Sequence, residues 1–222
     1  MSDDYGILRF GDEQEPIVVI DDFATAHEAL IQTASTQNFN VPPSHYPGIR
    51  APASAKYLEE RARIIEDILR NVFDITSGAS LIECNYSMVT QAPDSLKPFQ
   101  RFPHFDSVER GRIAVLHYLC GPQHGGTDFY RHKASGYETL NADRLPDYDA
   151  LRQSEYETDI GKGYPGPHLR HFETIGSVSA KLNRMLIYRG RMLHSGAIPD
   201  DMTFSDNPQI GRLTLNTFLR GR

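Results

Sequence analysis

The stretch HFDSVERGRIAVLHYL, residues 104–119, places a histidine and an aspartate two residues apart and follows them with a turn and an almost wholly apolar run. On an extended strand successive side chains point to opposite faces, so His104 and Asp106 project from one face while Phe105 points into a core. Imidazole and carboxylate groups both bind transition metals. The stretch therefore predicts a pair of metal ligands at the mouth of a buried strand.

A third ligand is predicted far along the chain, in NRMLIYRGRMLHSGAI (183–198), where His194 follows a run that reads as an apolar strand. Two histidines and one carboxylate on one side of a cation leave its other positions open, which is typical of Fe(II) sites that activate oxygen. The alternative is that the HxD pair occurs by chance and that each histidine is a hydrogen-bonded structural residue.

The closing stretch GRLTLNTFLRG (211–221) alternates, so that Arg212 and Thr214 share one face and the leucines share the other. An arginine that faces the interior of a barrel needs an anion. Its planar fork suits a carboxylate, to which the threonine hydroxyl can add a hydrogen bond. The alternative here is an internal ion pair with an aspartate or glutamate. Arg189 and Arg191 flank an expected turn and are expected to face solvent.

Short runs of strand character, separated by Gly, Pro, Asp and Asn, fill the chain from Leu81 onward. These strands are expected at 81–90, 112–120, 127–131, 172–178, 184–189 and 211–219. Helices that precede about eight short strands favour a mainly β fold with some α structure. We expect a double-stranded β-helix, or jelly-roll, core with N-terminal helices packed on one outer face.

The first part of the chain is expected to support that core. EPIVVIDDF (15–23) reads as a strand, and either of its aspartates could cap the helical stretch that follows at 24–35. The segment 41–54 reads as a loop. Residues 54–73 place their apolar side chains on one stripe, which predicts a single helix that lies on a sheet.

A single domain over 1–222 is expected, in which 1–79 supplies the N-terminal strand and supporting helices and 80–219 forms the jelly-roll core. A polar insertion, 132–171, interrupts this core and should contain one short helix near 147–155. Long excursions of this kind often act as lids or select substrates.

Composition restricts the classes of function. The chain has 23 basic and 29 acidic residues, a formal net charge of -6, which argues against a protein that neutralises nucleic-acid phosphates. No run approaches the roughly 20 apolar residues needed to cross a bilayer, and the acidic start does not resemble a signal peptide. A cytoplasmic protein is expected, in which Cys84 and Cys120 are buried reduced thiols.

Two further groups of histidines are not expected to bind a metal. His117 lies inside a predicted strand and should be a hydrogen-bonded core residue. His168 and His171 stand three residues apart, but they lack the cysteines that would accompany them in a typical structural zinc site.

Five motifs occur in an order that is known from one enzyme superfamily. They are HxD, HYL (117–119), GGTDFY (125–130), LIYRGRMLHSG (186–196) and the closing Arg-x-Thr. The chain thereby resembles the Fe(II)- and 2-oxoglutarate-dependent dioxygenases, particularly their prolyl-hydroxylase-like branch. The resemblance covers roughly 80–219, and the opening IVVIDDF (17–23) is in keeping with it.

The resemblance implies a role for each matched residue. His104, Asp106 and His194 would be the iron ligands and the catalytic centre, and Arg212 would bind the distal carboxylate of 2-oxoglutarate. Thr214 matches the second position of the family's Arg-x-Ser/Thr pattern. Tyr118 matches a tyrosine whose hydroxyl commonly meets the same carboxylate.

The expected function is therefore an Fe(II)- and 2-oxoglutarate-dependent oxygenase that hydroxylates an amino acid, a peptide or a small metabolite. It would use dioxygen, convert 2-oxoglutarate to succinate and carbon dioxide, and accept ascorbate as a reductant. The expected partner is that small-molecule or peptide substrate, without nucleic acid or membrane, and open sheet edges are compatible with a homodimer. Two alternatives remain open: a non-catalytic jelly-roll protein that binds a metal or an anion, and a cupin-like metalloenzyme that does not use 2-oxoglutarate.

Overall fold

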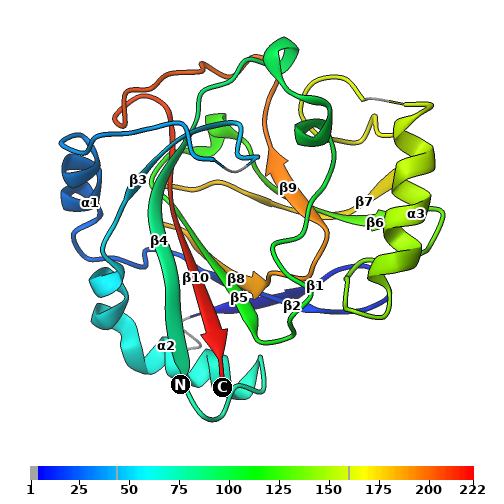
Figure 1. Ribbon diagram of the computed structural model, residues 1–222. Helices are drawn as coiled ribbons and strands as arrows, with labels where there is room; N and C mark the ends of the chain where they lie inside the picture. The colour runs from blue at the N-terminus through cyan, green and yellow to red at the C-terminus, as the bar shows by residue number, and fades with distance from the viewer. Residues whose placement is uncertain (1–4, 44, 160) are drawn as a thin grey trace.

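The computed structural model describes residues 5–43, 45–159 and 161–222. Two antiparallel sheets pack against each other as a jelly roll (Figure 1). The major sheet has the strand order β1 (Gly6–Arg9), β2 (Pro16–Ile20), β8 (Met185–Arg189), β5 (Arg112–Tyr118), β10 (Arg212–Gly221), β4 (Ala79–Val89) and β3 (Gly48–Pro52). The minor sheet has the order β7 (Phe172–Ser179), β6 (Gly126–His132) and β9 (His194–Ala197).

The strands expected from the sequence are present as β2, β4, β5, β6, β7, β8 and β10, with bounds close to those predicted. Three short strands, β1, β3 and β9, were not expected. The reading of 41–54 as a loop was wrong, because β3 lies within it and pairs with β4 at the edge of the major sheet. Its glycine and proline hide the strand in the sequence, and pairing with a neighbouring strand overrides that weak local preference.

The helices are α1 (His27–Ala34), α2 (Ala62–Asn71) and α3 (Leu145–Tyr156). The single helix expected over 54–73 is in fact a 3-10 helix, η1 (Ala55–Arg61), followed by α2. The short helix expected near 147–155 is confirmed as α3.

Neither aspartate of the IVVIDDF segment caps α1, so that expectation was wrong. The N-cap position belongs to Ala26, which makes no side-chain cap hydrogen bond. Asp21 instead accepts hydrogen bonds from Arg184 and Lys181, and these bonds lower its pKa to about 2. The carboxylate therefore ties the end of β2 to the turn before β8 rather than to the helix.

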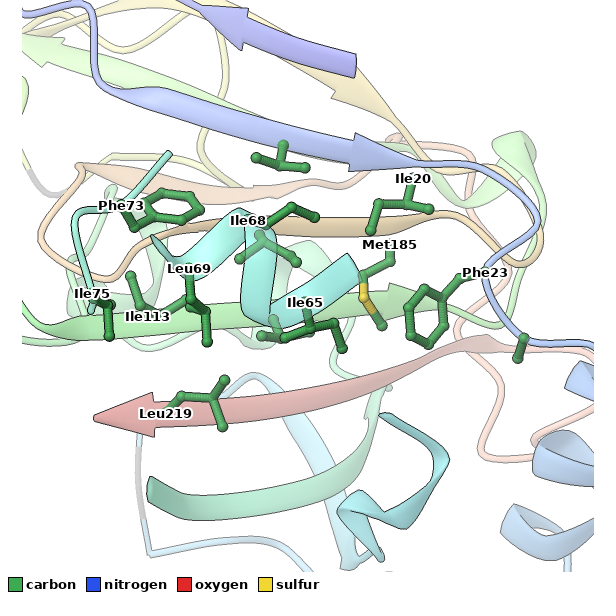
Figure 2. Packing of buried hydrophobic residues seen from close by; sticks show 14 residues of the cluster. Ile20, Phe23, Ile65, Ile68, Leu69, Phe73, Ile75, Ile113, Met185 and Leu219 are labelled. Carbon is green, nitrogen blue, oxygen red and sulfur yellow. The ribbon is translucent and has the colours of Figure 1, made fainter. Parts of the chain in front are cut away.

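The apolar stripe of α2 packs on the outer face of the major sheet (Figure 2). Ile65 and Ile68 are buried there among strand residues such as Ile113. Burying a side chain of this size contributes about 1.5–3 kcal/mol. Because strand side chains alternate, this packing holds β5 in place while Ala114 and Leu116 face the opposite side, where the cavity described below is formed.

The insertion 132–171 is anchored through α3. Tyr148 of this helix is buried with Phe102, Tyr130 and Phe172 at the minor sheet. Glu155 accepts hydrogen bonds from His132 and Arg152 and lies 3.3 Å from His171. Apolar packing and a buried polar network therefore fix this helix beside β6 and β7 (Figure 1). Within the described residues, no helix has the length and apolar character needed to cross a membrane.

Candidate functional site

The three predicted metal ligands meet at one point. His104 lies in the segment before β5 and forms an antiparallel bridge with His194, the first residue of β9, through backbone N–O distances of 2.9 and 2.8 Å. Asp106 Oδ1 lies 3.9 Å from His104 Nε2, and Asp106 Oδ2 lies 3.7 Å from His194 Nε2. Each residue offers a ligand atom within 4.8 Å of the others, which is close enough for one shared cation.

The tautomer of His194 suits a metal ligand. Its Nδ1 donates a hydrogen bond of 2.8 Å to the carbonyl oxygen of Met192, so the lone pair is left on Nε2, the atom that faces Asp106. Phe129 and Tyr188 lie beside the ring, with centroid distances of 6.4 and 4.9 Å. A hydrogen-bond acceptor behind the ring and aromatic packing around it orient metal-binding histidines in this way.

Asp106 shows the clearest need for a cation. Its side chain is 14% exposed, and its Oδ2 is buried without a hydrogen-bond partner among the described residues. Burial raises the pKa of this carboxyl group, while the charges of His194 and Arg50 oppose the rise. A buried carboxylate oxygen without a donor is costly, and a bound cation would remove that cost.

His104 completes the set in the neutral form that binds metals. The surrounding protein holds its pKa well below the usual range through burial, and the positive charges of His194 and Arg50 add to the effect. Its side chain is still 58% exposed, because it borders the cavity. Two imidazoles and a carboxylate that lacks a donor are a donor set that fits Fe(II) or a similar divalent ion.

Arg212 is buried, with 4% exposure, and lies on the wall of the same cavity. Its Nε and Nη2 donate to the carbonyl oxygens of His124 and Gly126, at 3.1 and 2.8 Å. Gly125 permits this arrangement: its φ is +84°, and an added Cβ would lie 1.7 Å from the carbonyl oxygen of Ala197. No carboxylate pairs with Arg212 within the described ranges, so the alternative of an internal ion pair is not supported.

Polar side chains surround Arg212. Thr214 lines the cavity and donates a long hydrogen bond of 3.4 Å to the carbonyl oxygen of Ser87. The hydroxyl of Tyr46, which also lines the cavity, is buried without a hydrogen-bond partner in the described part of the chain. The cavity wall therefore offers a buried guanidinium and the hydroxyl groups of Thr214 and Tyr46 to an anion.

Tyr118 stands one side chain behind the cavity wall. The guanidinium of Arg212 lies over its ring at 5.7 Å, and its hydroxyl is 2.5 Å from the Thr127 hydroxyl, which does line the cavity. Burial raises the pKa of Tyr118 to about 12, so this hydroxyl stays protonated and can donate. Thr127 is thus interposed between Tyr118 and any ligand.

One cavity of about 400 Å³ connects the ligand cluster to Arg212. Small-molecule sites usually measure about 300–1,000 Å³, so this volume suits small ligands. The sequence did not single out Tyr46, Arg50 or Asn216, which also line it. Arg50 lies in β3, the strand that was read as a loop, and Tyr46 lies just before it. Asn216 lies two residues beyond Thr214 in the closing strand, and no signal in the sequence indicates a role for it.

Other charged residues have structural roles. Arg189 was expected to face solvent, but it is 3% exposed and donates to the carbonyl oxygens of Phe73 and Arg110. It also pairs with Glu15, as does Arg191. The expectation failed because the end of β8 is covered by the segments around these partners, which the local sequence does not indicate.

The remaining histidines do not form a second metal site among the residues that the structure describes. His168 is exposed and bonds to the carbonyl oxygen of Lys162, while His171 pairs with Glu155. His117 is a buried, hydrogen-bonded core residue, as expected.

Solved structures with a similar fold include one with 2-oxoglutarate bound and one described as dependent on it. HygX from Streptomyces hygroscopicus, crystallised with nickel, 2-oxoglutarate and hygromycin B, is 11% identical, with a TM-score of 0.53 over 94% of this chain and 84% of that one. The non-heme α-ketoglutarate-dependent epimerase SnoN from nogalamycin biosynthesis is 12% identical, with a TM-score of 0.55 over 94% of this chain and 80% of that one. At such identities the likeness establishes a shared fold.

Sequence comparison identifies the family of the chain but assigns no activity to that family. No curated protein matches the chain by sequence. The sequence model of a family of unknown function, DUF6445, matches residues 3–219, nearly the whole chain. The chain belongs to the DUF6445 family.

Proposed function

We propose that this protein is an Fe(II)- and 2-oxoglutarate-dependent oxygenase. One observation carries the proposal: a cluster of two histidines and an aspartate shares a cavity with a buried arginine that has no acidic partner among the described residues. The fold, shared with enzymes that use 2-oxoglutarate, supports it. The motif order favours the prolyl-hydroxylase-like branch and hydroxylation as the outcome.

His104, Asp106 and His194 would hold the metal. When bound, the iron would supply the oxidising chemistry that no amino-acid side chain can provide. Arg212 would neutralise the distal carboxylate of 2-oxoglutarate, with Thr214 beside it as a hydroxyl donor. The protein itself contributes charge complementarity, fixed ligand geometry and exclusion of water.

The direct test is binding in the absence of oxygen. Protein loaded with Fe(II) under nitrogen should develop a weak visible charge-transfer band when 2-oxoglutarate is added, and turnover in air should release succinate. A band without succinate or substrate oxidation would favour a non-catalytic binding protein. Metal-dependent chemistry without the charge-transfer band and without succinate would favour a cupin-like enzyme. Each of these two results would overturn the proposal.

Arg212→Met should weaken 2-oxoglutarate binding about 30-fold or more, because a buried, charge-assisted hydrogen bond is lost. Metal affinity should change little, since the triad is untouched. Calorimetric titration of the Ni(II)-loaded protein with 2-oxoglutarate measures the effect. Arg70→Met, which removes an exposed charge from α2, is the control.

Arg212 also donates to two backbone carbonyl oxygens, so the methionine variant could lose stability as well as affinity. Arg212→Lys keeps the charge without the planar fork and should give an intermediate affinity. Wild-type affinity for 2-oxoglutarate in both variants would contradict the assignment.

Tyr118→Phe should have a smaller effect, about threefold to tenfold on 2-oxoglutarate affinity, because one hydrogen bond to Thr127 is removed. The affinity would fall because the Thr127 hydroxyl loses the partner that orients it. The same titration, with Tyr148→Phe as a buried control, checks the result. No change would leave Tyr118 with a packing role alone.

A further inference from the structure

Strand register places a second arginine at the same end of the cavity as Arg212. Arg50 of β3 and Thr214 of β10 both pair with Ser87 of β4, so they lie in one row across three strands. Neighbouring strands are about 4.8 Å apart, which separates the backbones of β3 and β10 by about 10 Å. Arg212 precedes Thr214 by two residues, and the cavity is lined by both of them and by Arg50. The long side chains of Arg50 and Arg212 can therefore reach one shared ligand.

Arg50 carries a charge that no carboxylate neutralises in the part of the chain that the structure describes. Its guanidinium lies over the ring of Tyr46 at 4.3 Å, and its Nε is buried without a hydrogen bond. A contact with an aromatic face orients a guanidinium but leaves its in-plane N–H groups free for an acceptor. An anionic ligand at this end of the cavity would supply that acceptor and a counter-charge.

Tyr46 brings a hydroxyl donor to the same place. Its ring packs against the apolar cluster that contains Val89, the residue of β4 that pairs with Arg212. Burial raises the pKa of the hydroxyl, and the charges of Arg212 and Arg50 oppose this rise, so both guanidinium groups lie near it. The Ser87 hydroxyl lowers this pKa to a smaller extent, but Tyr46 has no hydrogen bond of ordinary geometry among the described residues. A protonated, unbonded hydroxyl is therefore available to a ligand.

The backbone around Tyr46 is held in place before any ligand binds. The carbonyl oxygen of Tyr46 accepts a hydrogen bond of 2.9 Å from the N–H of Gly48, and that of Pro47 accepts one of 3.3 Å from the N–H of Thr90. Gly48 is required here, because an added Cβ would lie 1.9 Å from the carbonyl oxygen of Met88. A donor fixed in this way costs little to order when a ligand arrives.

Arg212 alone does not satisfy a carboxylate. Two of its five N–H groups, on Nε and Nη2, donate to backbone carbonyl oxygens, which occupies one edge of the guanidinium. The opposite edge can give a carboxylate two hydrogen bonds, and the Thr214 hydroxyl can give one more. A carboxylate has about four acceptor sites, so at least one of them is left for Tyr46 or Arg50.

We propose that Tyr46 and Arg50 complete the site for the distal carboxylate of the co-substrate, with the Tyr46 hydroxyl donating to it and Arg50 adding a second positive charge. This inference rests on the proposed function, because it assigns this end of the cavity to 2-oxoglutarate. Tyr46 and Arg50 then determine which 2-oxo acid is accepted. A co-substrate with an uncharged far end would leave these donors unpaired and would be rejected.

The test compares 2-oxoglutarate with 2-oxopentanoate, which has the same chain length and a methyl group in place of the distal carboxylate. Each is titrated into Ni(II)-loaded protein by calorimetry, so that no turnover occurs. The ratio of the two dissociation constants then reports recognition of the distal charge, separately from binding at the metal. The wild-type protein should prefer 2-oxoglutarate by about 100-fold or more.

Tyr46→Phe should lower this ratio about tenfold and Arg50→Met about 30-fold, through weaker binding of 2-oxoglutarate alone. Affinity for 2-oxopentanoate and for Ni(II) should stay within about twofold of wild type, because the metal ligands are untouched. Arg50→Lys should retain part of the ratio, since it keeps the charge without the planar fork. Tyr148→Phe, within the buried cluster under α3, and Arg70→Met, on α2, should retain all of it.

Two results would overturn the inference. One is a wild-type ratio in both Tyr46→Phe and Arg50→Met. The other is equal weakening of the two 2-oxo acids in these variants, which would mean that the substitutions disturb the cavity as a whole. Failure of the wild-type protein to bind 2-oxoglutarate would instead overturn the proposed function.

Discussion

Asp106→Asn should abolish metal binding and leave the metal-free protein as stable as wild type or more stable. The carboxylate is buried, its Oδ2 lacks a donor among the described residues, and burial raises its pKa. A raised carboxyl pKa means that the ionised group disfavours the folded state above that pKa, so removing the charge at pH 7 relieves a cost. The same charge is needed to hold a divalent cation between His104 and His194.

The measurement is thermal unfolding with and without Ni(II). At a metal concentration 100 times the dissociation constant, binding should stabilise the wild-type protein by about 2.7 kcal/mol, and the variant should show no such gain. Metal affinity should fall more than about 100-fold, because even residues that only support metal ligands contribute 10–100-fold. Asp94→Asn, at an exposed carboxylate, is the control.

Two results would contradict this prediction. Retained metal stabilisation in Asp106→Asn would remove the aspartate from the ligand set. A metal-free variant that is clearly less stable than wild type would show that the carboxylate has a structural role, which the missing hydrogen bond at Oδ2 argues against.

The parts of the site that the sequence predicted lie on strands with strong local signals or in the segment directly before one. Strand alternation placed His104 with Asp106 and Arg212 with Thr214, and the structure places both pairs on the wall of one cavity. The jelly-roll fold was also expected, because short strands and turn residues alternate regularly from Leu81 onward. Such features are local, and local patterns can be read from one sequence.

The features that were missed depend on contacts between distant segments. β3 is held by pairing with β4, although its own sequence reads as a loop, so Arg50 could not be placed in the cavity. Arg189 has its partners on the segments around Glu15 and Phe73, which are far away along the chain. No periodicity in a single sequence reports which distant backbone carbonyl will face a given arginine.

The buried residue His117 allows a test of the core on the face of the major sheet that is turned away from the cavity. Its side chain is fully buried, stacks on Tyr57 and meets Phe23 edge to face. Its Nε2 is 3.0 Å from Asn183 Oδ1, and its Nδ1 has no partner among the described residues. Burial lowers the pKa of His117 from 6.5 to about 4. The hydrogen bond to Asn183 opposes this shift, and the charge of His27 adds to it.

This lowered pKa should make the fold less stable in acid. Above pH 6.5 the histidine is neutral in both the folded and the unfolded chain, so it has no pH-dependent effect. Between pH 6.5 and 4 the unfolded chain takes up a proton that the folded chain excludes, and stability therefore falls. The difference of about 2.5 pH units corresponds to about 3 kcal/mol.

His117→Phe should remove this loss, because phenylalanine keeps the ring between Tyr57 and Phe23 and does not titrate. Asn183 Oδ1 still accepts a bond from the backbone N–H of Ala24, so it is not left unpaired. Urea unfolding at pH 7 and at pH 4 should show a decrease in unfolding free energy that is about 3 kcal/mol smaller in the variant than in wild type. His168→Gln, at an exposed histidine, should follow wild type. Equal decreases in all three proteins would mean that His117 is protonated in the folded state, and the neutral, buried imidazole described for β5 would then be wrong.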